Sequence, residues 1–484
     1  MAKRRPKKPM LKFPKRMQKK MIVMFTVVAA LMIGLIGRLM YIEYTSGEKY
    51  EKIVLAQQGY DSQTIPYQRG DIVDAKGTVL ATSIAVYNVI LDCSVLNDDE
   101  KYVEPTINAL VSCFPDLTSE QLYSYLKDSP DSRYIVLAKR LSYDTIQPFV
   151  NLQEERDEKG KLVNPYIKGV WFEKEYQRQY PYGKITSHLL GYVRSISAEE
   201  LEANSGKGYT ELSIIGKTGL EKIYENRLKP GTGCEIYITN SSGNKVKTLA
   251  KTEENNGETI TTTIDIRLQD KIYKQLDGDN GLSVAINPKT GEVLALVSTP
   301  TYDSNDFIKG FSDEAWNKLN NDKNNPMLVR YQNTYVPGSS FKPITAAIGL
   351  TTGKMSANEN YGASGLSWQN NSSWGNYRVT TLQTYSGPAN LRNALIYSDN
   401  IYFAKSALKI GANTFAEQLL KIGFDTEMPF TINMDKSQFA NDNKFVSEIQ
   451  LADTGYGQGK VLVNPLHMAS MYSAFANEGN MIKP

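Results

Sequence analysis

The sequence has few of the residues on which hydrolytic and metal-dependent enzymes commonly rely. Its 484 residues include two histidines, His188 and His467, and three cysteines, Cys93, Cys113 and Cys234. Two histidines argue against a histidine-based metal site and against a Ser-His-Asp triad. Three cysteines are too few, and odd in number, for a disulfide framework. We therefore expect no metal and no cofactor.

Acidic residues are missing from the start of the chain, where Glu43 is the first to occur. Residues 1–20 hold ten Lys or Arg, and residues 21–37 are apolar apart from Thr26. A helix of about 20 residues is roughly 30 Å long, enough to cross a bilayer if Arg38 extends to its surface. Basic flanks stay cytoplasmic, so we predict a cytoplasmic tail at 1–20 and an uncleaved transmembrane anchor at 21–42. A cleaved signal peptide is the alternative, but no small-x-small site closes the run.

The rest of the chain has the composition of ordinary folded domains. Without the ten basic residues of the tail, 45 basic and 52 acidic residues remain, a net charge of −7. A mildly acidic body argues against nucleic acid as a partner. The length corresponds to about three domains. The anchor places these domains on the outer face of the membrane, where ATP and NAD chemistry is not expected.

The residue pattern predicts an α+β chain in two regions, 43–250 and 261–484, joined by a polar linker at 251–260. The first region mixes short elements: strands at 72–73, 79–80 and 87–91, and helices at 105–114 and 119–127. The second begins with a helix at 265–276 and a hairpin of strands at 282–286 and 293–298. Helical patterns dominate from there to the end.

Without a usable histidine, a serine enzyme needs another base, and a lysine kept neutral can serve. On a helix, Ser-x-x-Lys puts the lysine one turn from the serine on the same face. The pattern alone is weak, because it occurs five times: Ser46/Lys49, Ser124/Lys127, Ser242/Lys245, Ser339/Lys342 and Ser406/Lys409.

Context favours Ser339. It follows a chain-reversal signal, Pro337-Gly338, and precedes an apolar helical run. This places Ser339 at a helix N-terminus, where its backbone N–H can help to form an oxyanion hole. The alternative is an N-cap serine with a solvated Lys342.

A second element, Ser398-Asp399-Asn400, supports this choice. It lies between two helical segments, 59 residues after Ser339. From a tight turn, the Ser398 hydroxyl and the Asn400 amide can both point into a cleft, where they would relay a proton and hold a substrate amide. The alternative for Ser398 is a helix cap.

The two motifs resemble those of the penicillin-binding transpeptidases. Pro337-Gly338-Ser339-Ser340-Phe341-Lys342 is similar to the nucleophile motif, and Ser398-Asp399-Asn400 to the Ser-x-Asn motif. Residues 69–74, 178–181 and 219–225 resemble the pedestal of class B members. Other segments resemble their transpeptidase domain: 263–265, 287–292, 302–305, 455–459 and 464–465. Residues 373–377 and 451–459 look closest to the low-affinity class B members.

One family motif, Lys-Thr-Gly or Lys-Ser-Gly after Ser-x-Asn, has no counterpart in the 84 residues that follow Asn400. We therefore expect a chain truncated at its C-terminus and impaired in catalysis. Lys217-Thr218-Gly219 lies upstream of Ser339, and Thr218 with Glu221 predicts a capping box. It is no phosphate loop either, because Glu211 stands where that motif needs glycine.

The resemblance implies a membrane-anchored serine D,D-transpeptidase with a class B pedestal at 43–250 and a partial transpeptidase domain at 261–484. Its catalytic residues would be Ser339, Lys342, Ser398 and Asn400. It would act on peptidoglycan stem peptides, be acylated by β-lactams, and work with a membrane-embedded glycan polymerase or with divisome or elongasome proteins. A β-lactamase or a β-lactam sensor fits a large pedestal and a single anchor less well. A non-catalytic scaffold that recruits wall-building proteins is the alternative from another functional class.

Overall fold

The computed structural model describes residues 17, 19–21, 23–38, 60–65, 67–211, 213–231, 233–239, 245–252 and 255–484. They form two compact units, one from the parts before residue 67 and from 232–254, and the other from 67–231 and 255–484. The first unit contains an apolar helix, Lys19–Arg38, that is long enough to cross a membrane and has no side chain buried by protein. The predicted anchor coincides with this helix up to Arg38, and its positions 39–42 lie outside the described residues.

The first unit also contains an antiparallel sheet of order β1-β8-β9. Its strands are β1 (Tyr60–Ile65), β8 (Gly233–Thr239) and β9 (Lys245–Lys251). Tyr60 pairs with Ile238 and Ile65 with Gly233, so β1 joins a strand that lies about 170 residues later in the sequence.

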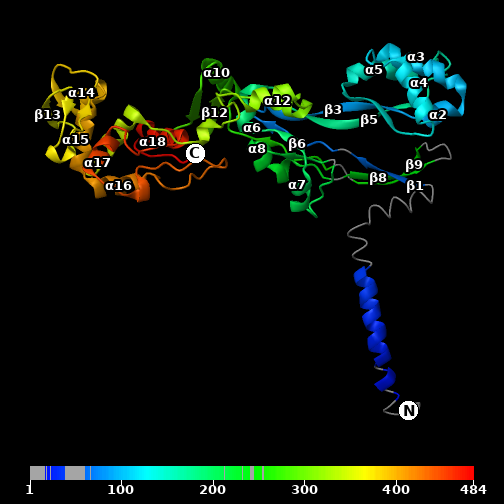
Figure 1. Cartoon of the computed structure of the whole chain (residues 1–484), viewed down its shortest axis with the longest axis horizontal. Coiled ribbons are helices and arrows are strands. Elements are labelled where there is room, and N and C mark those ends of the chain that lie inside the picture. Colours follow the sequence, from blue (N-terminus) through cyan, green and yellow to red (C-terminus); the bar gives the residue numbers. More distant parts are fainter. Residues whose placement is uncertain are drawn as a thin grey trace, which may run out of the picture. The chain divides into compact units, whose positions relative to one another are not determined.

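The pedestal part of the second unit is organised around one long strand, β3 (Val79–Leu91), drawn in blue in Figure 1. β3 pairs antiparallel with β2 (Ile72–Val73), β4 (Ile135–Leu141) and β5 (Val170–Gln179). The predicted strands at 79–80 and 87–91 are therefore halves of one strand. The residues between them stay extended because they pair with β5, from Thr82 with Gln179 onward.

Four helices pack on the far end of β3, where Val89 and Leu91 are buried among them. They are α2 (Cys93–Asp98), α3 (Val103–Cys113), α4 (Ser119–Asp128) and α5 (Tyr143–Glu154), and the turn η1 (Glu100–Tyr102) joins the first two. The helices predicted at 105–114 and 119–127 are thus confirmed as α3 and α4. α4 begins with a capping box in which Thr118 and Gln121 satisfy each other's backbone N–H groups.

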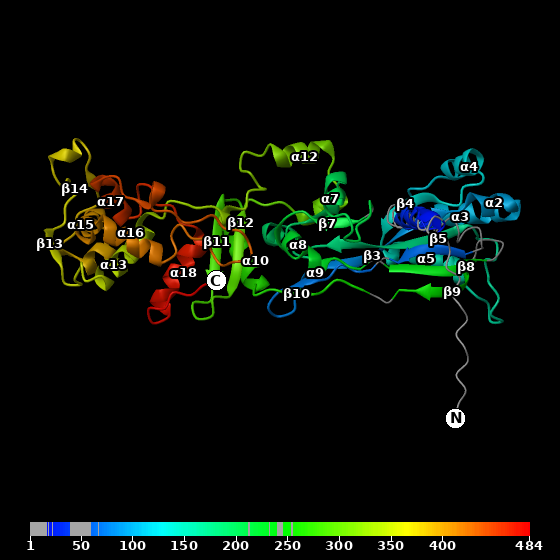
Figure 2. The same ribbon diagram turned by 90° about the horizontal axis from the view of Figure 1, so that it is seen from below.

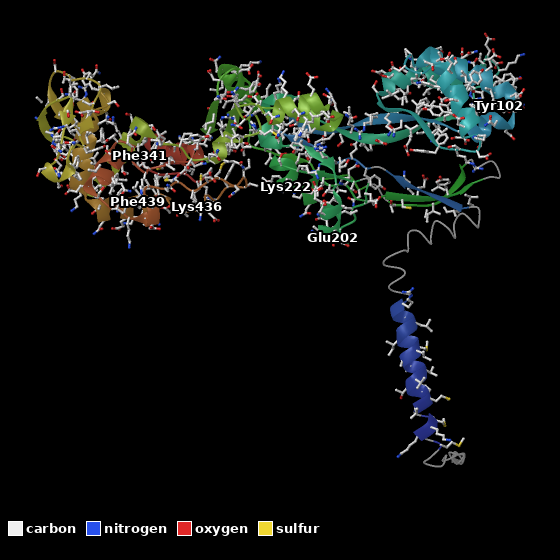
Figure 3. The ribbon with its side chains drawn as sticks, viewed as in Figure 1. Tyr102, Glu202, Lys222, Phe341, Lys436 and Phe439 are labelled. Carbon is white, nitrogen blue, oxygen red and sulfur yellow. The ribbon has the colours of Figure 1, made fainter. Side chains whose placement is uncertain are left out.

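Short elements fill the region between β5 and the transpeptidase part. They are η2 (Gly183–Ile185), α6 (Ser187–Leu190), β6 (Val193–Ser195), α7 (Ala198–Ala203), β7 (Ile214–Gly216), α8 (Gly219–Ile223) and α9 (Glu225–Leu228). Figure 3 labels Glu202 on α7 and Lys222 on α8.

A buried ion cluster holds α8 against β5 and against the segment before β2. Glu221 on α8 is fully buried, and its two oxygens accept from Arg69 Nε and Arg178 Nε, each at 2.7 Å. Arg69 also pairs with Glu225 at 2.6 Å. Burial works to raise the pKa of Glu221, but the charges of Arg178 and Arg69 outweigh it and hold this pKa below its usual value.

The capping box predicted at Thr218 and Glu221 is wrong. Thr218 does occupy the N-cap of α8, but its side chain makes no cap hydrogen bond. Glu221 cannot turn back to cap the helix, because both of its oxygens are held by the two arginines. Lys217 pairs with Glu200 of α7, so residues 217–219 belong to the framework of the pedestal, as expected for a structural segment.

The segment predicted as a linker, 251–260, starts in β9 and ends in β10 (Ile260–Thr261), which pairs in parallel with β2. The Gly257 and Ile260 N–H groups donate to the carbonyls of Gln68 and Asp71. Next comes α10 (Ile266–Leu276), which confirms the helix predicted at 265–276, with Asp265 as its N-cap. β11 (Gly281–Ile286) and β12 (Val293–Thr299) form the predicted hairpin.

The remainder of the second unit is mostly helical, as expected. Figure 2 shows α13, α15, α16 and α17 gathered at one end, while α10 and α18 lie beside the β11–β12 hairpin. The helices are α11 (Ser304–Lys309), α12 (Asp313–Asn320), α13 (Lys342–Thr351), α14 (Leu391–Ile396), α15 (Asn400–Ile410), α16 (Ala412–Lys421), α17 (Glu448–Gly455) and α18 (Pro465–Ala476).

Short turns and strands connect these helices. They are the turns η3 (Arg330–Gln332), η4 (Gly338–Phe341), η5 (Ser372–Trp374) and η6 (Asn441–Asn443), and the paired strands β13 (Asn360–Ala363) with β16 (Pro388–Asn390) and β14 (Ser367–Trp368) with β15 (Val379–Thr380). The core is aromatic, and Figure 3 labels Phe341 and Phe439, both fully buried in it.

We predict that Glu221→Gln destabilises the chain by about 3–5 kcal/mol, because it leaves two buried arginines with too little negative charge. The measurement is denaturant unfolding of the detergent-solubilised protein. Glu258→Gln is the matched control, since Glu258 pairs with Arg227 where both side chains are more than half exposed. Equal midpoints for the two variants would contradict this account of the cluster.

Candidate active site

Ser339 lies on the turn η4, directly before α13. Its predecessor Gly338 has a φ of +56°, a conformation that glycine adopts without strain. The Gly338 N–H donates to the carbonyl of Gly457 at 2.9 Å, which fixes the start of the turn. Pro343 stands in the first turn of α13, where its missing N–H costs nothing. Ser339 is exposed, as a nucleophile has to be.

Lys342 begins α13 one turn after Ser339, and only 2% of its surface is exposed. Its Nζ lies 3.0 Å from Ser339 Oγ. The side chain passes the ring of Phe403, whose centroid is 6.0 Å from Nζ. The solvated lysine considered as the alternative is therefore excluded.

Ser398 and Asn400 come from the junction of α14 and α15. Ser398 has a φ of +54°, and this left-handed conformation separates the two helices. Its Oγ lies 2.9 Å from Ser339 Oγ and 2.8 Å from Lys342 Nζ. Asn400 is the first residue of α15, and its Oδ1 accepts from Lys342 Nζ at 2.7 Å. The amide orientation is set by Asn400 Nδ2, which donates to the Thr380 carbonyl at 2.8 Å.

The structure thus brings together the four residues proposed from the sequence. Ser398 does not cap α15, because Asp399 performs that role through the Tyr402 N–H. The positions of the two hydroxyls and the amine suit proton transfer among Ser339, Lys342 and Ser398.

Four oxygen atoms surround Lys342 Nζ, one more than an ammonium group has N–H bonds. The Ser398 carbonyl, at 2.6 Å, and Asn400 Oδ1 can only accept, so they take two N–H groups in either protonation state. The third position on Lys342 Nζ faces the hydroxyls of Ser339 and Ser398. An ammonium donates a proton there, whereas a neutral amine accepts the proton of Ser339.

Burial lowers the pKa of Lys342 from 10.5 to about 8, and the nearby carboxylate of Asp399 raises it in part. With a pKa of about 8, roughly one molecule in ten carries the neutral amine at pH 7. With the ordinary value, the neutral fraction would be about one in three thousand. The site therefore supplies a usable base without a histidine.

The two other Ser-x-x-Lys pairs that the structure describes, Ser124/Lys127 and Ser406/Lys409, do not form such a site. Ser124 Oγ donates to the Gln121 carbonyl within α4, and Ser406 Oγ to the Tyr402 carbonyl within α15. Ser46 and Ser242 lie outside the described residues.

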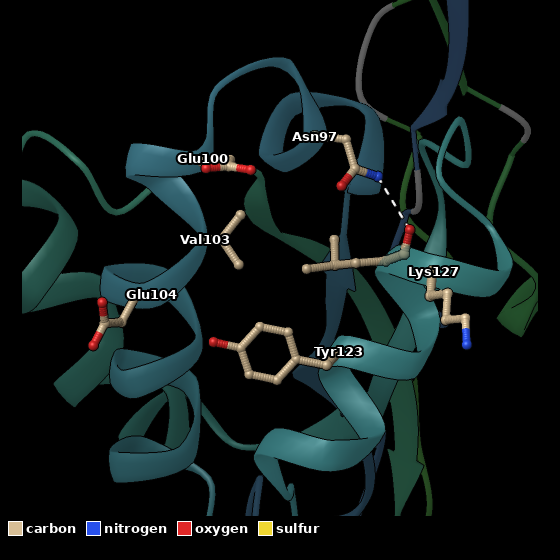
Figure 4. A pocket seen from close by; sticks show the side chains of 7 residues that line it. Asn97, Glu100, Val103, Glu104, Tyr123 and Lys127 are labelled. Atoms are coloured by element: carbon tan, nitrogen blue, oxygen red, sulfur yellow. Dashed lines mark hydrogen bonds between the residues drawn. The ribbon is translucent and has the colours of Figure 1, made fainter.

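A pocket of about 460 Å³ lies elsewhere, between α3 and α4 of the pedestal. Figure 4 shows Tyr123 projecting from α4 into the space that faces Val103 and Glu104. The Asn97 amide donates to the Leu126 carbonyl at 3.2 Å. The lining contains no serine, cysteine or histidine, so it does not offer a serine- or cysteine-type nucleophile.

Comparison with known proteins gives two family matches along this chain. Residues 64–262 match the model for the penicillin-binding protein dimerisation domain, and residues 281–484 match the penicillin-binding protein transpeptidase domain. The chain belongs to the penicillin-binding proteins. A dimerisation domain followed by a transpeptidase domain is the arrangement expected of class B. Membership of the low-affinity subgroup stays a prediction.

Two curated relatives of this penicillin-binding protein are penicillin-binding protein 3 of Bacillus subtilis and the peptidoglycan D,D-transpeptidase MrdA of Escherichia coli K12. The first is 41% identical over 87% of this chain and 60% of its own length. The second is 30% identical over 85% of this chain and 65% of its own length. The chain thus spans somewhat less than two thirds of these relatives.

Solved structures of the PBP2 penicillin-binding protein from Helicobacter pylori share the fold. The complex of that protein with MreC covers 88% of this chain and 78% of the solved chain, with a TM-score of 0.67 and 25% identity. PBP2 alone gives a TM-score of 0.64.

The sequence pattern assigned no role to Gly455 and Gly457, whose backbones pack against the elements that carry the site residues. Gly457 has a φ of +78°, and a Cβ built on it would lie 1.9 Å from the Gly338 carbonyl oxygen. A Cβ built on Gly455 would lie 2.5 Å from the Phe403 carbonyl oxygen, and the Gly455 carbonyl accepts from Thr345 of α13 at 2.8 Å. The repeated glycines at 455–459 were the only signal in the sequence, and they gave no indication of which backbone approaches them.

We predict that Gly457→Ala lowers penicillin acylation at least 100-fold, because the new Cβ displaces the Gly338 carbonyl and with it the turn that carries Ser339. The control is Gly353→Ala. Gly353 has a similar positive φ of +67°, but a Cβ built on it would have no neighbouring atom within 4 Å. The rate of fluorescent penicillin labelling, corrected for the folded fraction, decides the matter. Similar rates in both variants would show that close packing at Gly457 is unimportant.

Proposed function

We propose that this chain is a serine-type D,D-transpeptidase that cross-links peptidoglycan stem peptides. The observation that carries the proposal is the position of Lys342 Nζ, which lies within 3.0 Å of both Ser339 Oγ and Ser398 Oγ. The Escherichia coli relative is named as a peptidoglycan D,D-transpeptidase, which supports the same reaction.

In the first half-reaction, Ser339 Oγ attacks the carbonyl carbon of the penultimate D-Ala and its proton passes to Lys342. An ester bond forms, the peptide C–N bond breaks, and the terminal D-Ala leaves as an amine. Ser398, which contacts both Oγ of Ser339 and Nζ of Lys342, passes a proton to this leaving amine. Asn400 holds the Lys342 side chain in place and has a second amide proton for the substrate.

In the second half-reaction, an amine of a neighbouring stem peptide attacks the ester. A new amide bond forms, the amine loses a proton through the same residues, and Ser339 regains its hydroxyl. A β-lactam acylates Ser339 in the same way, but its leaving amine stays tethered to the acyl group. Covalent inhibition by penicillin follows from this chemistry.

The alternative function is a scaffold that recruits wall-building proteins through its pedestal. The solved relative bound to MreC supports a partner of this kind for the present chain as well. We propose that the pedestal binds such a divisome or elongasome protein and that a membrane-embedded glycan polymerase acts beside it. These contacts are compatible with catalysis, and covalent labelling separates a pure scaffold from an enzyme.

We predict that Ser339→Ala abolishes covalent labelling by fluorescent penicillin, because Ser339 is the exposed serine directly before α13, with its Oγ 3.0 Å from Lys342 Nζ. Ser398, the other serine beside Lys342, lies at the α14–α15 junction and is less exposed. Ser340→Ala is the adjacent control, since its hydroxyl donates to the Pro337 carbonyl instead. Ser46→Ala, Ser124→Ala, Ser242→Ala and Ser406→Ala should also keep the label. A labelled peptide that maps away from Ser339 would contradict the assignment, and an unlabelled parent chain would favour the scaffold. The parent's labelling rate, set against that of a full-length relative, also tests the expected impairment.

We also propose that the helix Lys19–Arg38 spans the membrane with the N-terminus in the cytoplasm. The basic residues before the helix support this orientation. Protease added outside intact cells is predicted to digest the body and leave a short anchored fragment that carries the tail. Opened cells are the control, in which the tail is digested too. A soluble mature protein that begins after residue 42 would contradict the anchor.

A further inference from the structure

Tyr385, which lies between β15 and β16, contacts the residues on both sides of Ser398. Its ring stacks on that of Tyr397, with centroids 4.5 Å apart and planes inclined by 10°. Its hydroxyl donates to Asp399 Oδ2 at 2.8 Å. One side chain therefore holds both neighbours of the residue whose left-handed backbone directs its carbonyl and hydroxyl toward Lys342.

Tyr385 is itself fixed by its backbone. The Ser364 hydroxyl donates to the Tyr385 carbonyl at 2.8 Å and accepts from the Tyr385 N–H at 2.8 Å. This pair of hydrogen bonds ties the loop before β16 to the segment after β13. The ring thus approaches Ser398 from a supported position.

Asp399 connects Tyr385 to the charge of the base. Its carboxylate is 2% exposed, with Oδ1 at the N-cap of α15 and Oδ2 on Tyr385. The negative charge favours the ammonium form of Lys342. A hydroxyl dipole that points its hydrogen at the carboxylate reduces the field that Lys342 feels.

The other groups around Lys342 do not replace this carboxylate. The elements packed against α13 are η4, α14, α15 and α17, and η4 carries no charge. The titratable or charged residues on the other three, with the cap of α15, are Arg392, Asp399, Tyr402, Lys405, Lys409, Glu448 and Asp453. Lys409 pairs with Glu359, and burial raises the pKa of Tyr402. Glu448 accepts from Trp374, and Asp453 from Tyr377 and Tyr456. Asp399 is the carboxylate whose charge acts on Lys342.

We propose that Tyr385 is a positioning residue for the transpeptidase reaction: it holds Ser398 in its left-handed conformation through Tyr397 and moderates the charge of Asp399 beside Lys342. This inference rests on the proposed function, since it assigns a role in the same site. The two contacts act separately. The ring controls where Ser398 lies, and the hydroxyl controls how readily Lys342 loses its proton.

Substitutions can separate the two contacts. Tyr385→Phe keeps the stacking and removes the hydrogen bond to Asp399, whereas Tyr385→Leu removes both. Asp399→Asn removes the charge but keeps a good N-cap residue. Tyr402→Phe is the control, because the Tyr402 hydroxyl has no hydrogen-bond partner among the described residues.

Two measurements are made on each form of the full chain in detergent. The first is the pH dependence of acylation by one β-lactam. The second is the titration of the ¹³Cε resonance of Lys342 in lysine-labelled protein, assigned by its loss in Lys342→Met. The second measurement requires no activity, so it tests the inference even if the chain is not acylated.

For the parent chain, acylation rises with pH through about 8, the pKa of Lys342, because only the neutral amine accepts the proton. In Tyr385→Phe we expect the titration and the rising limb to move up by about 0.5–1 pH unit. Acylation then falls roughly 3–10-fold at pH 7 and returns to the parent rate above the new pKa. In Asp399→Asn, the Lys342 titration and the rising limb of acylation should both move to lower pH. Tyr402→Phe should change neither of these two quantities.

In Tyr385→Leu the maximum rate at high pH should also fall, about tenfold or more, because Ser398 is no longer held. A Lys342 titration that is the same in Tyr385→Phe as in the parent would overturn the inference. So would a Tyr385→Leu plateau equal to that of Tyr385→Phe. A parent chain that is not acylated, with the titration shifted as expected, would overturn the proposed function while supporting the role of Tyr385.

Discussion

The amine of Lys342 is enclosed by four oxygen atoms, and the arrangement of the transpeptidase part depends on keeping it there. A buried amine needs hydrogen-bond partners at short distance, or burial would simply destabilise the fold. The turn η4, directly before Lys342 at the start of α13, provides Ser339. The α14–α15 junction provides Ser398 and Asn400. Because the partners come from separate helices, the packing of α13 on α15 sets the distances on which proton transfer depends.

The pedestal also buries charged side chains, but there each charge is paired with an opposite charge. There, the buried carboxylate of Glu221 lies between Arg69 and Arg178, and all three side chains keep their charges. A guanidinium does not lose its proton in proteins, so the cluster can only hold segments together. Lys342 has no directly bonded carboxylate in the structure, since Asp399 bonds to Tyr385 and to the cap of α15. That difference allows Lys342 to change its protonation state.

Three positions with positive φ frame the site. Gly338 and Gly457 adopt this conformation freely, and a Cβ on Gly457 would collide with the Gly338 carbonyl oxygen. Ser398 has a side chain and pays about 1–3 kcal/mol for the same conformation. The strain is retained because the hydroxyl, the carbonyl and the reversal of the chain are all used at this residue. Stacking and hydrogen bonding by Tyr385 stabilise it from outside.

The sequence determined the local elements and pointed to the four residues, Ser339, Lys342, Ser398 and Asn400, that the structure brings together. Apolar periodicity gave α3, α4 and α10, the Asn-Pro-x-x-Gly turn gave the β11–β12 hairpin, and the turn before an apolar helix selected Ser339 from five similar pairs. These features depend on residues near one another in the chain, so a local pattern can reveal them. The strands at 79–80 and 87–91 became one because β5, some 90 residues later, pairs with the residues between them.

Only the tertiary structure decided which charged groups pair and which backbone segments pack closely against each other. Glu221 has the spacing of a capping residue, but two arginines from distant segments hold it more strongly than a helix end can. The glycines at 455–459 and Tyr385 had no local meaning that a pattern could express, because their partners are Gly338, Phe403, Tyr397 and Asp399. The basicity of Lys342 belongs to the same class, since it depends on how completely other elements exclude water from its amine.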